Sequence, residues 1–342
     1  MNRILLTGAG FSRNWGGWLT DEITNQLLSK INQAPDPAIA EAYLNGIAAN
    51  GGNYEAILEC IHRLHSDDPE SQGKILRYVE DAIRGCFIEM DKLYEGKDAG
   101  LTDNATYNAE VFLAHFDAIF TTNQDGLIER LFANSFNPLG FSRTDRRNRW
   151  GVGLPGIIGM PTTHVVPNYR REITYSVLDE AFAFSSLDAR YLPYVKLHGS
   201  YDWQTYVGHR LMISGGRKSQ QISGSPLLSS YFNYFSEVTK RQDTHIVVIG
   251  YGFSDVHINA EIVKACETGA RVSLLDPLGA QVTRFKHFTL DASLQQGAPQ
   301  RDVFQALRGR LSVISQRTLK EIFEDINQAK QLFRQALNVN VG

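Results

Sequence analysis

The stretch LPYVKLHGS, residues 192–200, joins an apolar run to a short polar turn that contains a histidine. The apolar part, Leu192 to Val195, has the composition of a buried strand, and the glycine after His198 allows the backbone to bend. In an open α/β sheet, ligands bind at the carboxyl ends of the strands. His198 is therefore a candidate site residue at a strand end.

Three other apolar runs in the chain also end in polar or glycine-rich loops. They are ILL (residues 4–6) before GAGFS (8–12), AIF (118–120) before TTNQD (121–125), and IVVI (246–249) before GYGFSD (250–255). Because the carboxyl ends of parallel strands lie at one edge of a sheet, we expect the four loops to converge on one site.

Five runs are apolar without alternation, which is typical of buried parallel strands. They lie around residues 3–7, 117–121, 193–197, 244–250 and 271–275. Helical patterns lie between them, with Thr20, Asp125 and either Ser254 or Asp255 as the expected N-caps. The recurrence of strand, polar loop and helix predicts an α/β fold with a doubly wound, mostly parallel, Rossmann-like sheet.

The segments between these strands suggest how the chain is organised. Residues 38–116 have helical spacing and are predicted to form an insertion after the first strand, either as a wall of the site or as a purely structural element. Residues 138–170, rich in glycine, proline and arginine, are expected to form a long irregular loop. Residues 206–214 are predicted to form a hairpin, and residues 316–342 one amphipathic helix after a catalytic domain that spans residues 1–315.

Composition sets limits on the partners. The chain has 342 residues, 43% of them hydrophobic, which is enough for a sizeable core. Its 34 basic and 37 acidic side chains give a net charge of -3. This balance provides no general attraction to nucleic acid or to an anionic membrane, so we do not expect direct binding to nucleic acid. The basic run of Arg143, Arg146, Arg147 and Arg149 is either a solvated surface or a local contact for a partner, a phosphate or nucleic acid.

Cysteine usage and hydropathy point to the cytoplasm. Cys60, Cys86 and Cys266 are far apart and form no Cys-x-x-Cys pair, so the sequence supports neither a disulfide framework nor a zinc ribbon, and we expect no metal. The run Ile4-Leu5-Leu6 is too short for a signal peptide, and no apolar stretch approaches the roughly 18 to 20 residues that span a bilayer.

The first glycine loop alone is a weak signal. Glycines after a strand let backbone amides approach a diphosphate, but the third glycine of the usual dinucleotide fingerprint is replaced here by Arg13. An ordinary dehydrogenase is therefore disfavoured, whereas phosphate binding by the loop remains expected. The candidate residues are Gly8, Ala9, Gly10, Phe11 and Ser12.

The four motifs together resemble a known family. GAGFS, TTNQD, KLHGS and GYGFSD, in this order, resemble the sirtuin-like NAD-consuming domains of bacteria, particularly those of anti-phage defence systems. The resemblance covers residues 1 to about 275. It implies a sirtuin type of Rossmann-like fold and NAD as the substrate.

The resemblance also implies roles for individual residues. The first loop would bind NAD, Asn123 would lie by the nicotinamide ribose with Asp125 beside it, and His198 would be the catalytic base. Asp276, at the end of the fifth strand, would lie near the adenosine. Contacts to the diphosphate and the adenosine ribose would come from Gly250, Gly252, Ser254 and Asp255.

Residue chemistry agrees with these roles. An asparagine can hold a ribose hydroxyl or a water molecule, and a histidine with an ordinary pKa of about 6.5 accepts a proton near neutrality. Asn123 and Asp125 can alternatively cap the helix that follows them. The aromatic residues near the motifs can either stack on a ligand or pack in the core; they are Trp15, Trp18, Tyr201 and Trp203.

The departures from the family favour hydrolysis. Protein-deacylating sirtuins carry a four-cysteine zinc module, which this chain cannot build, and NWGGWLT (residues 14–20) stands where they have GIPDFR. The first hypothesis is therefore an NAD glycohydrolase that acts in anti-phage defence. The alternatives are an NAD-dependent deacylase or ADP-ribosyltransferase, and a non-catalytic module that binds NAD or ADP-ribose.

The defence hypothesis implies partners, because unrestrained NAD loss would harm the host. We expect the switch to be self-assembly into a homo-oligomer or a second protein, such as a HerA-type ATPase or an Argonaute-like sensor.

Overall fold

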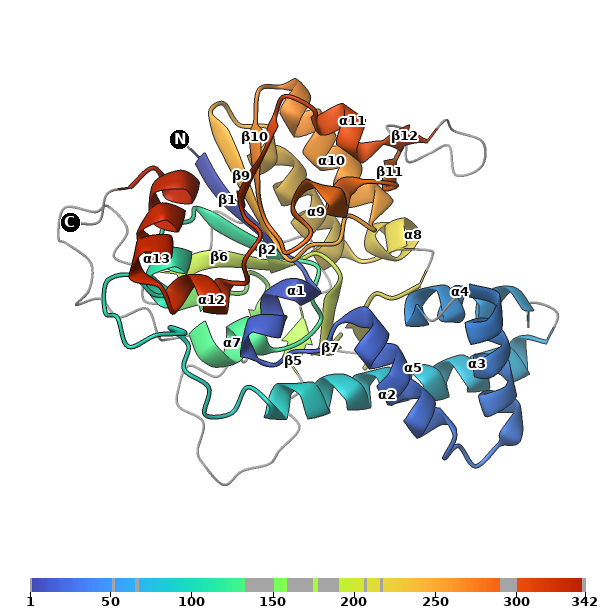
Figure 1. Ribbon diagram of the computed structural model, residues 1–342. Helices are drawn as coiled ribbons and strands as arrows, with labels where there is room; N and C mark the ends of the chain where they lie inside the picture. Colours follow the sequence, from blue (N-terminus) through green and yellow to red (C-terminus); the bar gives the residue numbers. More distant parts are fainter. Residues whose placement is uncertain are drawn as a thin grey trace.

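The computed structural model describes residues 2–50, 53–64, 68–132, 151–158, 175–177, 191–205, 208–215, 218–289 and 300–339. The predicted irregular loop at 138–170 lies outside these residues except for 151–158, and the basic run Arg143, Arg146, Arg147 and Arg149 lies outside them too. The chain folds around one large sheet, with a lobe of helices below it (Figure 1).

The large sheet has seven strands, and all of its pairings are parallel. In spatial order they are β13 (Leu311–Ser315), β10 (Arg271–Leu275), β9 (Thr244–Ile249), β1 (Asn2–Thr7), β2 (Ala118–Thr121), β6 (Tyr191–Lys196) and β3 (Gly151–Gly153). The doubly wound, mostly parallel, Rossmann-like fold predicted from the sequence is confirmed. Every residue of β9 is buried, including the polar Thr244 and His245 that precede its apolar run at residues 246–249.

The strand order changes direction between β1 and β9. From β1 the chain proceeds to β2, then to the edge strand β3 and back to β6, which lies between β2 and β3, before it returns to β9 and continues through β10 to β13 at the other edge. Such a switch point opens a crevice at the carboxyl ends of the two central strands, which is where α/β sheets bind ligands.

A helical lobe follows the first strand, as predicted. Its helices are α2 (Thr20–Ile31), α3 (Pro37–Asn50), α4 (Tyr54–Leu64) and α5 (Pro69–Lys92). Asp68 caps α5 by accepting a hydrogen bond from the Ser71 amide. The predicted cap of α2 was wrong by one residue, since Leu19 precedes the helix and donates its amide to the Glu22 carboxylate.

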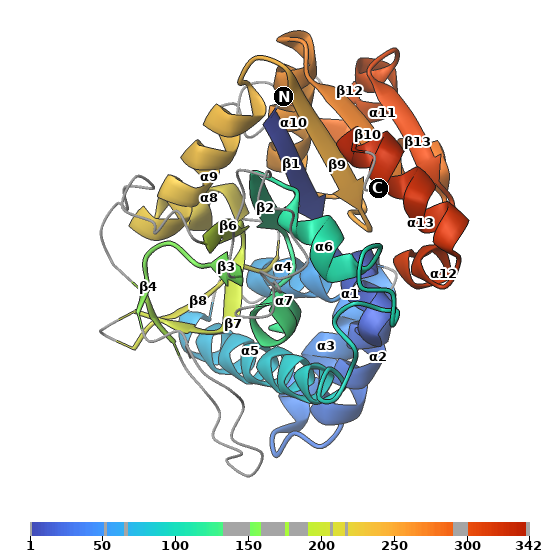
Figure 2. The same ribbon diagram turned by 90° about the vertical axis from the view of Figure 1, so that its left-hand side faces the viewer.

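The remaining helices cover the two faces of the sheet. They are α6 (Ala109–Ala114), α7 (Leu127–Phe132), α8 (Lys218–Ser223), α9 (Pro226–Thr239), α10 (Val256–Glu267), α11 (Val303–Leu307), α12 (Leu319–Phe323) and α13 (Ile326–Leu332). Helices α6, α12 and α13 lie on one face, and α9, α10 and α11 lie on the other (Figure 2). No helix of the described residues is long and apolar enough to cross a membrane.

The C-terminal third differs from the predictions in two ways. β13 adds an edge strand to the sheet that was not among the predicted strands. The single helix expected over residues 316–342 is instead α12, α13 and a π-helical turn, Phe333–Leu337, with residues 340–342 outside the description. Asp325 separates α12 from α13, since its carboxylate accepts hydrogen bonds from the amides that begin α13.

A smaller sheet extends from the histidine turn. Its strands are β4 (Ile157–Ile158), β5 (Tyr175–Val177), β7 (Gly199–Gln204) and β8 (Arg210–Met212). The predicted hairpin at 206–214 therefore supplies only one arm, β8, and its antiparallel partner β7 begins in the histidine motif itself. A separate two-stranded ladder joins β11 (His287–Phe288) to β12 (Arg301–Asp302).

Candidate functional site

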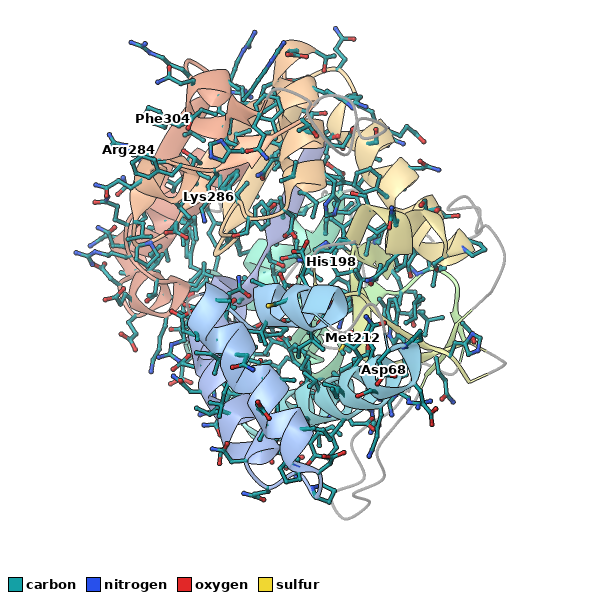
Figure 3. The ribbon with its side chains drawn as sticks, turned by 90° about the vertical axis from the view of Figure 1, so that its right-hand side faces the viewer. Asp68, His198, Met212, Arg284, Lys286 and Phe304 are labelled. Carbon is teal, nitrogen blue, oxygen red and sulfur yellow. The ribbon has the colours of Figure 1, made fainter. Side chains whose placement is uncertain are left out.

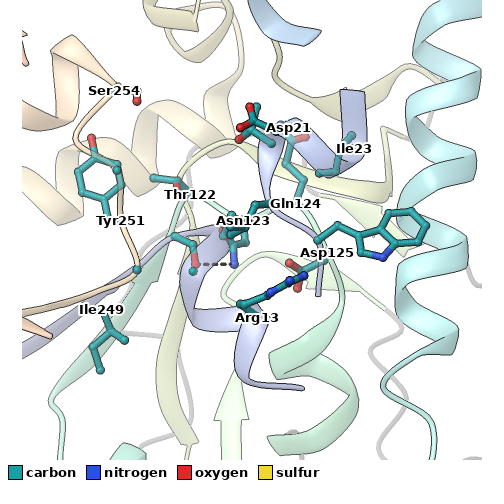
Figure 4. Close-up of a pocket in the computed structure, with 18 of the residues that line it drawn as sticks. Arg13, Asp21, Ile23, Thr122, Asn123, Gln124, Asp125, Ile249, Tyr251 and Ser254 are labelled. Carbon is teal, nitrogen blue, oxygen red and sulfur yellow. Dashed lines mark hydrogen bonds between the residues drawn. The ribbon is translucent and has the colours of Figure 1, made fainter. Parts of the chain in front are cut away.

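A cavity of about 500 Å³ lies at the carboxyl ends of the central strands, a volume typical of small-molecule sites. Its walls come from the loops after β1, β2, β6, β9 and β10 and from the helical lobe. Asn123 lies near the centre of the lining residues, with Tyr251 on one side and Asp125 on the other (Figure 4). The four loops predicted to converge do so here.

Most of the predicted site residues line this cavity. They are Gly8, Ala9, Gly10, Asn123, Asp125, His198, Gly250, Gly252, Ser254, Asp255 and Asp276. Phe11 and Ser12 are not among the lining residues. The Phe11 ring is buried in the core with its centroid 5.1 Å from that of Trp15, so its side chain faces away from any ligand.

Ser12 instead connects two candidate catalytic residues. The Asn123 side-chain nitrogen donates to Ser12 Oγ at 2.8 Å, and Ser12 Oγ donates to Asp125 Oδ2 at 2.8 Å. Asn123 Nδ2 also donates to the Gly8 carbonyl at 3.0 Å, which can only accept and therefore fixes the orientation of the amide. Both amide hydrogens are thus used within the protein, and the Asn123 carbonyl oxygen remains as the acceptor for a ligand.

Asp125 combines the helix-capping and site roles that the sequence left open. Its Oδ1 accepts a hydrogen bond from the Leu127 amide at 3.0 Å, at the start of α7. Burial raises the pKa of Asp125 to about 6, although the charge of Lys196 opposes this rise. The carboxylate is therefore ionised at neutral pH at a cost to stability.

Lys196, the first residue of the KLHGS motif, fixes the loop after β2 to the end of β6. Its ammonium group donates to the Asp125 backbone carbonyl and to the Glu129 carboxylate, the latter at 2.7 Å. In this ion pair between Lys196 and Glu129, the lysine side chain has 0% exposure. Burial lowers the pKa of Lys196, but Glu129 and two aspartates outweigh this and raise it above its usual value. The lysine is therefore a buried cation that positions the neighbouring loop.

The glycines of the first and fourth loops allow the two loops to pack against each other. Gly250 has φ +62°, and a Cβ at this position would lie 2.3 Å from the Gly10 carbonyl carbon. The Gly10 amide donates to the Gly250 carbonyl at 3.0 Å, and the Gly8 and Phe11 amides also have acceptors within the protein. The Gly8 and Gly10 amides therefore join the first loop to the end of β9 and the loop after it, and the Phe11 amide closes a turn within the first loop, so these three donors are already engaged, which differs from the phosphate cradle expected from the sequence.

His198 lies between the helical lobe and the sheet (Figure 3). Its side chain is only 2% exposed, and its Nε2 atom lies 3.9 Å from Asp255 Oδ1. Burial lowers the pKa of His198 to about 3, although Asp255 opposes the fall. The ordinary pKa assumed from the sequence is therefore wrong, and the imidazole is neutral at physiological pH.

Asp255 occupies the N-cap position of α10, but its carboxylate makes no capping bond. Instead Lys218 Nζ lies 2.6 Å from Asp255 Oδ1 and 2.8 Å from Glu55 Oε2. Burial raises the pKa of Asp255, but Lys218 and the neighbouring histidines outweigh it and hold the pKa well below its usual range. The lysine thus bridges the helical lobe to the loop after β9 at the wall of the cavity.

The aromatic residues near the motifs divide between core and cavity. Trp15 and Trp203 are buried in the core, and the Tyr201 hydroxyl donates to Asp91 at 2.6 Å. Trp18 lines the cavity together with Phe87 of α5. The helical lobe therefore contributes an apolar wall to the site.

The chain is similar to known proteins in two comparisons. Residues 117–275 match the family model of the SIR2-like domain. A solved structure of a mutant Sir2 homologue in complex with 2'-O-acetyl ADP-ribose is similar with 12% identity and a TM-score of 0.40, covering 100% of this chain and 95% of that chain. No curated protein matches the chain.

The SIR2-like match runs from the start of β2 to the end of β10. It therefore contains the loops of Asn123, His198 and Asp255, while the glycine loop after β1 precedes it. Within the described residues, no group of three or more His, Cys, Asp or Glu side chains is placed to hold a metal ion.

Three polar residues in or beside the cavity are absent from the predictions made from the sequence. Glu55 and Lys218 lie on segments without a recognisable motif, and only the structure brings them to Asp255. His257 belongs to none of the four motifs although it follows Asp255 by two residues, and its Nε2 lies 3.3 Å from His198 Nε2. Its position in the first turn of the helix after GYGFSD was the available signal.

Proposed function

We propose that the chain hydrolyses NAD to nicotinamide and ADP-ribose. The observation that carries the proposal is that the Asn123 carboxamide and the His198 imidazole line the same cavity, at the ends of the neighbouring strands β2 and β6. The match to the SIR2-like domain and the resemblance of the four motifs to NAD-consuming enzymes support NAD as the substrate.

The bond that breaks joins the ribose C1' carbon to the nicotinamide nitrogen. Its electron pair leaves with nicotinamide, which departs as a neutral molecule and needs no acid. A water oxygen forms the new bond to C1', and the proton that the water loses passes through a base to solvent. Positive charge therefore moves from the pyridinium ring to the ribose in the transition state.

Two carboxylates of the cavity are suited to stabilise that charge. Asp255 stays ionised because Lys218 pairs with it, and Asp125 is ionised above about pH 6. Buried carboxylates act strongly on a developing cation because little water screens them. The Asn123 carbonyl oxygen, whose amide hydrogens are already used, is available to accept from a ribose hydroxyl or from the attacking water.

His198 is proposed to receive a proton from a ribose hydroxyl or water. A neutral imidazole is in the correct state for this at every physiological pH. A positioned general base contributes up to roughly 10²- to 10⁴-fold to the rate, and contributes most when its pKa lies near the operating pH.

The nucleotide half of NAD would occupy the remainder of the cavity. Gly252 and Ser254 are exposed on the loop after β9 and are proposed to contact the diphosphate and adenosine ribose. Asp276 lies beyond them at the end of β10, beside Leu278 and Thr318 of the cavity wall, and is proposed to lie near the adenosine.

The biological role proposed for this activity is anti-phage defence by NAD depletion. It rests on the resemblance of the motifs to defence-system domains. A trigger is then required, and we propose self-assembly or a second protein such as a HerA-type ATPase or an Argonaute-like sensor. Measuring cellular NAD after phage infection, with and without the neighbouring genes, tests this role.

Product analysis tests the reaction itself. The full chain is incubated with NAD, alone and with its genomic neighbours, in the presence and absence of an acylated peptide. Hydrolysis predicts equal amounts of nicotinamide and ADP-ribose without peptide. Nicotinamide release that requires the peptide would instead identify a deacylase, ADP-ribose attached to protein would identify a transferase, and binding without turnover would identify a regulatory module.

A further inference from the structure

A second histidine lies directly behind the candidate catalytic one. His198 lines the cavity, whereas His257 does not, and the two Nε2 atoms face each other at 3.3 Å. The His257 ring also packs near Phe232, with ring centroids 5.6 Å apart. Any effect of His257 on a ligand in the cavity therefore acts through its contact with His198.

The facing nitrogens restrict how hydrogens are placed. Burial lowers the pKa of His198 to about 3 and that of His257 to about 4, so both rings are neutral at pH 7. A neutral imidazole has one N–H and one lone pair, so a hydrogen bond between two Nε2 atoms needs the hydrogen on one of them and the lone pair on the other. In either case the Nε2 of His198 is occupied by this bond, so a proton from a substrate has to go to Nδ1.

The requirement for a proton acceptor selects one of the two arrangements. Nδ1 of His198 has a lone pair only if its hydrogen sits on Nε2, and that hydrogen then points at the lone pair of His257 Nε2. We propose that His257 is a positioning residue that holds His198 in the Nε2–H tautomer, leaving Nδ1 free to accept the proton released during NAD hydrolysis. This inference rests on the proposed function.

The surroundings also favour the charged state that follows. When His198 Nδ1 takes the proton from a hydroxyl of the ribose or from the attacking water, the ring becomes an imidazolium and keeps its Nε2–H bond to His257. The Asp255 carboxylate, 3.9 Å from Nε2, and the backbone of Thr122 both favour this charged form. The proton then leaves to solvent with the products, and the pair returns to its starting state.

Two substitutions separate the hydrogen bond from the packing. His257→Phe keeps an aromatic ring beside Phe232 but removes the acceptor, whereas His257→Gln can place an amide oxygen near the position of the imidazole Nε2. We expect His257→Phe to lower kcat by at least about tenfold with KM changed by less than about threefold, and His257→Gln to retain most of kcat. His245→Gln is the control, since His245 is a buried histidine that bonds Ser273 outside the cavity.

Nitrogen-15 NMR of the histidine rings gives a readout that does not depend on turnover. The expected result is the Nε2–H tautomer for His198 in the wild type and in His257→Gln, and a mixture of tautomers in His257→Phe. A wild-type His198 in the Nδ1–H tautomer, or a folded His257→Phe variant with the wild-type kcat, would overturn the inference. A wild-type chain that releases no nicotinamide would refute the proposed function, and the tautomer would still decide whether His257 positions His198.

Discussion

Replacing Asp125 by asparagine should stabilise the protein in a way that depends on pH. Burial raises the pKa of Asp125 from 3.8 to about 6 in the folded state. Between these two values the folded protein keeps a proton that the unfolded chain has lost, so stability falls as the pH rises through this window. Above pH 6 the full cost of the buried charge is present, and asparagine removes it.

The magnitude follows from the pKa. A rise of about two pKa units, at roughly 1.4 kcal/mol per unit, amounts to about 3 kcal/mol at pH 8. Asparagine can still accept from the Leu127 amide, but its NH₂ group then faces Ser12, whose hydroxyl hydrogen loses its acceptor. That loss offsets about 1 kcal/mol. We therefore expect Asp125→Asn to be more stable than the wild type by about 2 kcal/mol at pH 8 and by less than about 1 kcal/mol at pH 5.

Urea denaturation followed by circular dichroism at the two pH values measures this difference. Asp255→Asn is the matched comparison, because the pKa of Asp255 is lowered and its contribution is present above about pH 4. That variant leaves Lys218 with one carboxylate fewer and should be less stable at pH 8 by about 1.5 to 3 kcal/mol. An Asp125→Asn variant less stable than the wild type at pH 8 would refute the reasoning.

Three further predictions concern the same site. Lys196→Met should lower the free energy of unfolding by about 3 to 5 kcal/mol, because it leaves buried carboxylates unpaired. The control Lys240→Met removes the lysine of a partly exposed ion pair and should lower it by less than about 1 kcal/mol. Equal losses for the two variants in chemical denaturation would contradict this prediction. Holding a residue other than glycine in the left-handed conformation costs roughly 1 to 2 kcal/mol. Gly269→Ala, at a position with positive φ and open space around it, should destabilise the protein by only that amount, whereas Gly250→Ala should destabilise it by more, because its Cβ would also clash with the first loop. Thermal melting distinguishes the two variants. The kcat/KM for NAD should rise as the pH increases through about 6, because Asp125 ionises there. If Asp125→Asn still shows this rise in a plot of kcat/KM against pH, the rise belongs to another group.

The central strands could be predicted because their physical signal is local. In β9 all six residues are buried, and residues 246–249 form a continuous apolar run whose length fits a strand. The edge strand β13 gave no such signal, since Ser312 and Val313 are exposed and the pattern resembles an irregular segment. Edge strands are half solvated, and their pairing is decided by the sheet that they join.

The site was predictable at the level of loops rather than of side-chain directions. Asn123 and His198 belong to motifs at strand ends, and the topology alone brings them to one edge of the sheet. Phe11 belongs to an equally recognisable motif, yet the short helix that follows β1 turns its ring into the core. Lys218 meets Asp255 across 37 residues of sequence, a contact that depends on tertiary packing and leaves no pattern in the chain.

The most direct test of the central claim compares nicotinamide release from NAD by the wild type, His198→Ala and Asn123→Ala, each supplied with the same genomic neighbours. We predict that the wild type releases nicotinamide and ADP-ribose without any peptide. Each variant should lose at least about a hundredfold of that rate while melting as a folded protein. Full nicotinamide release by either folded variant would contradict the account.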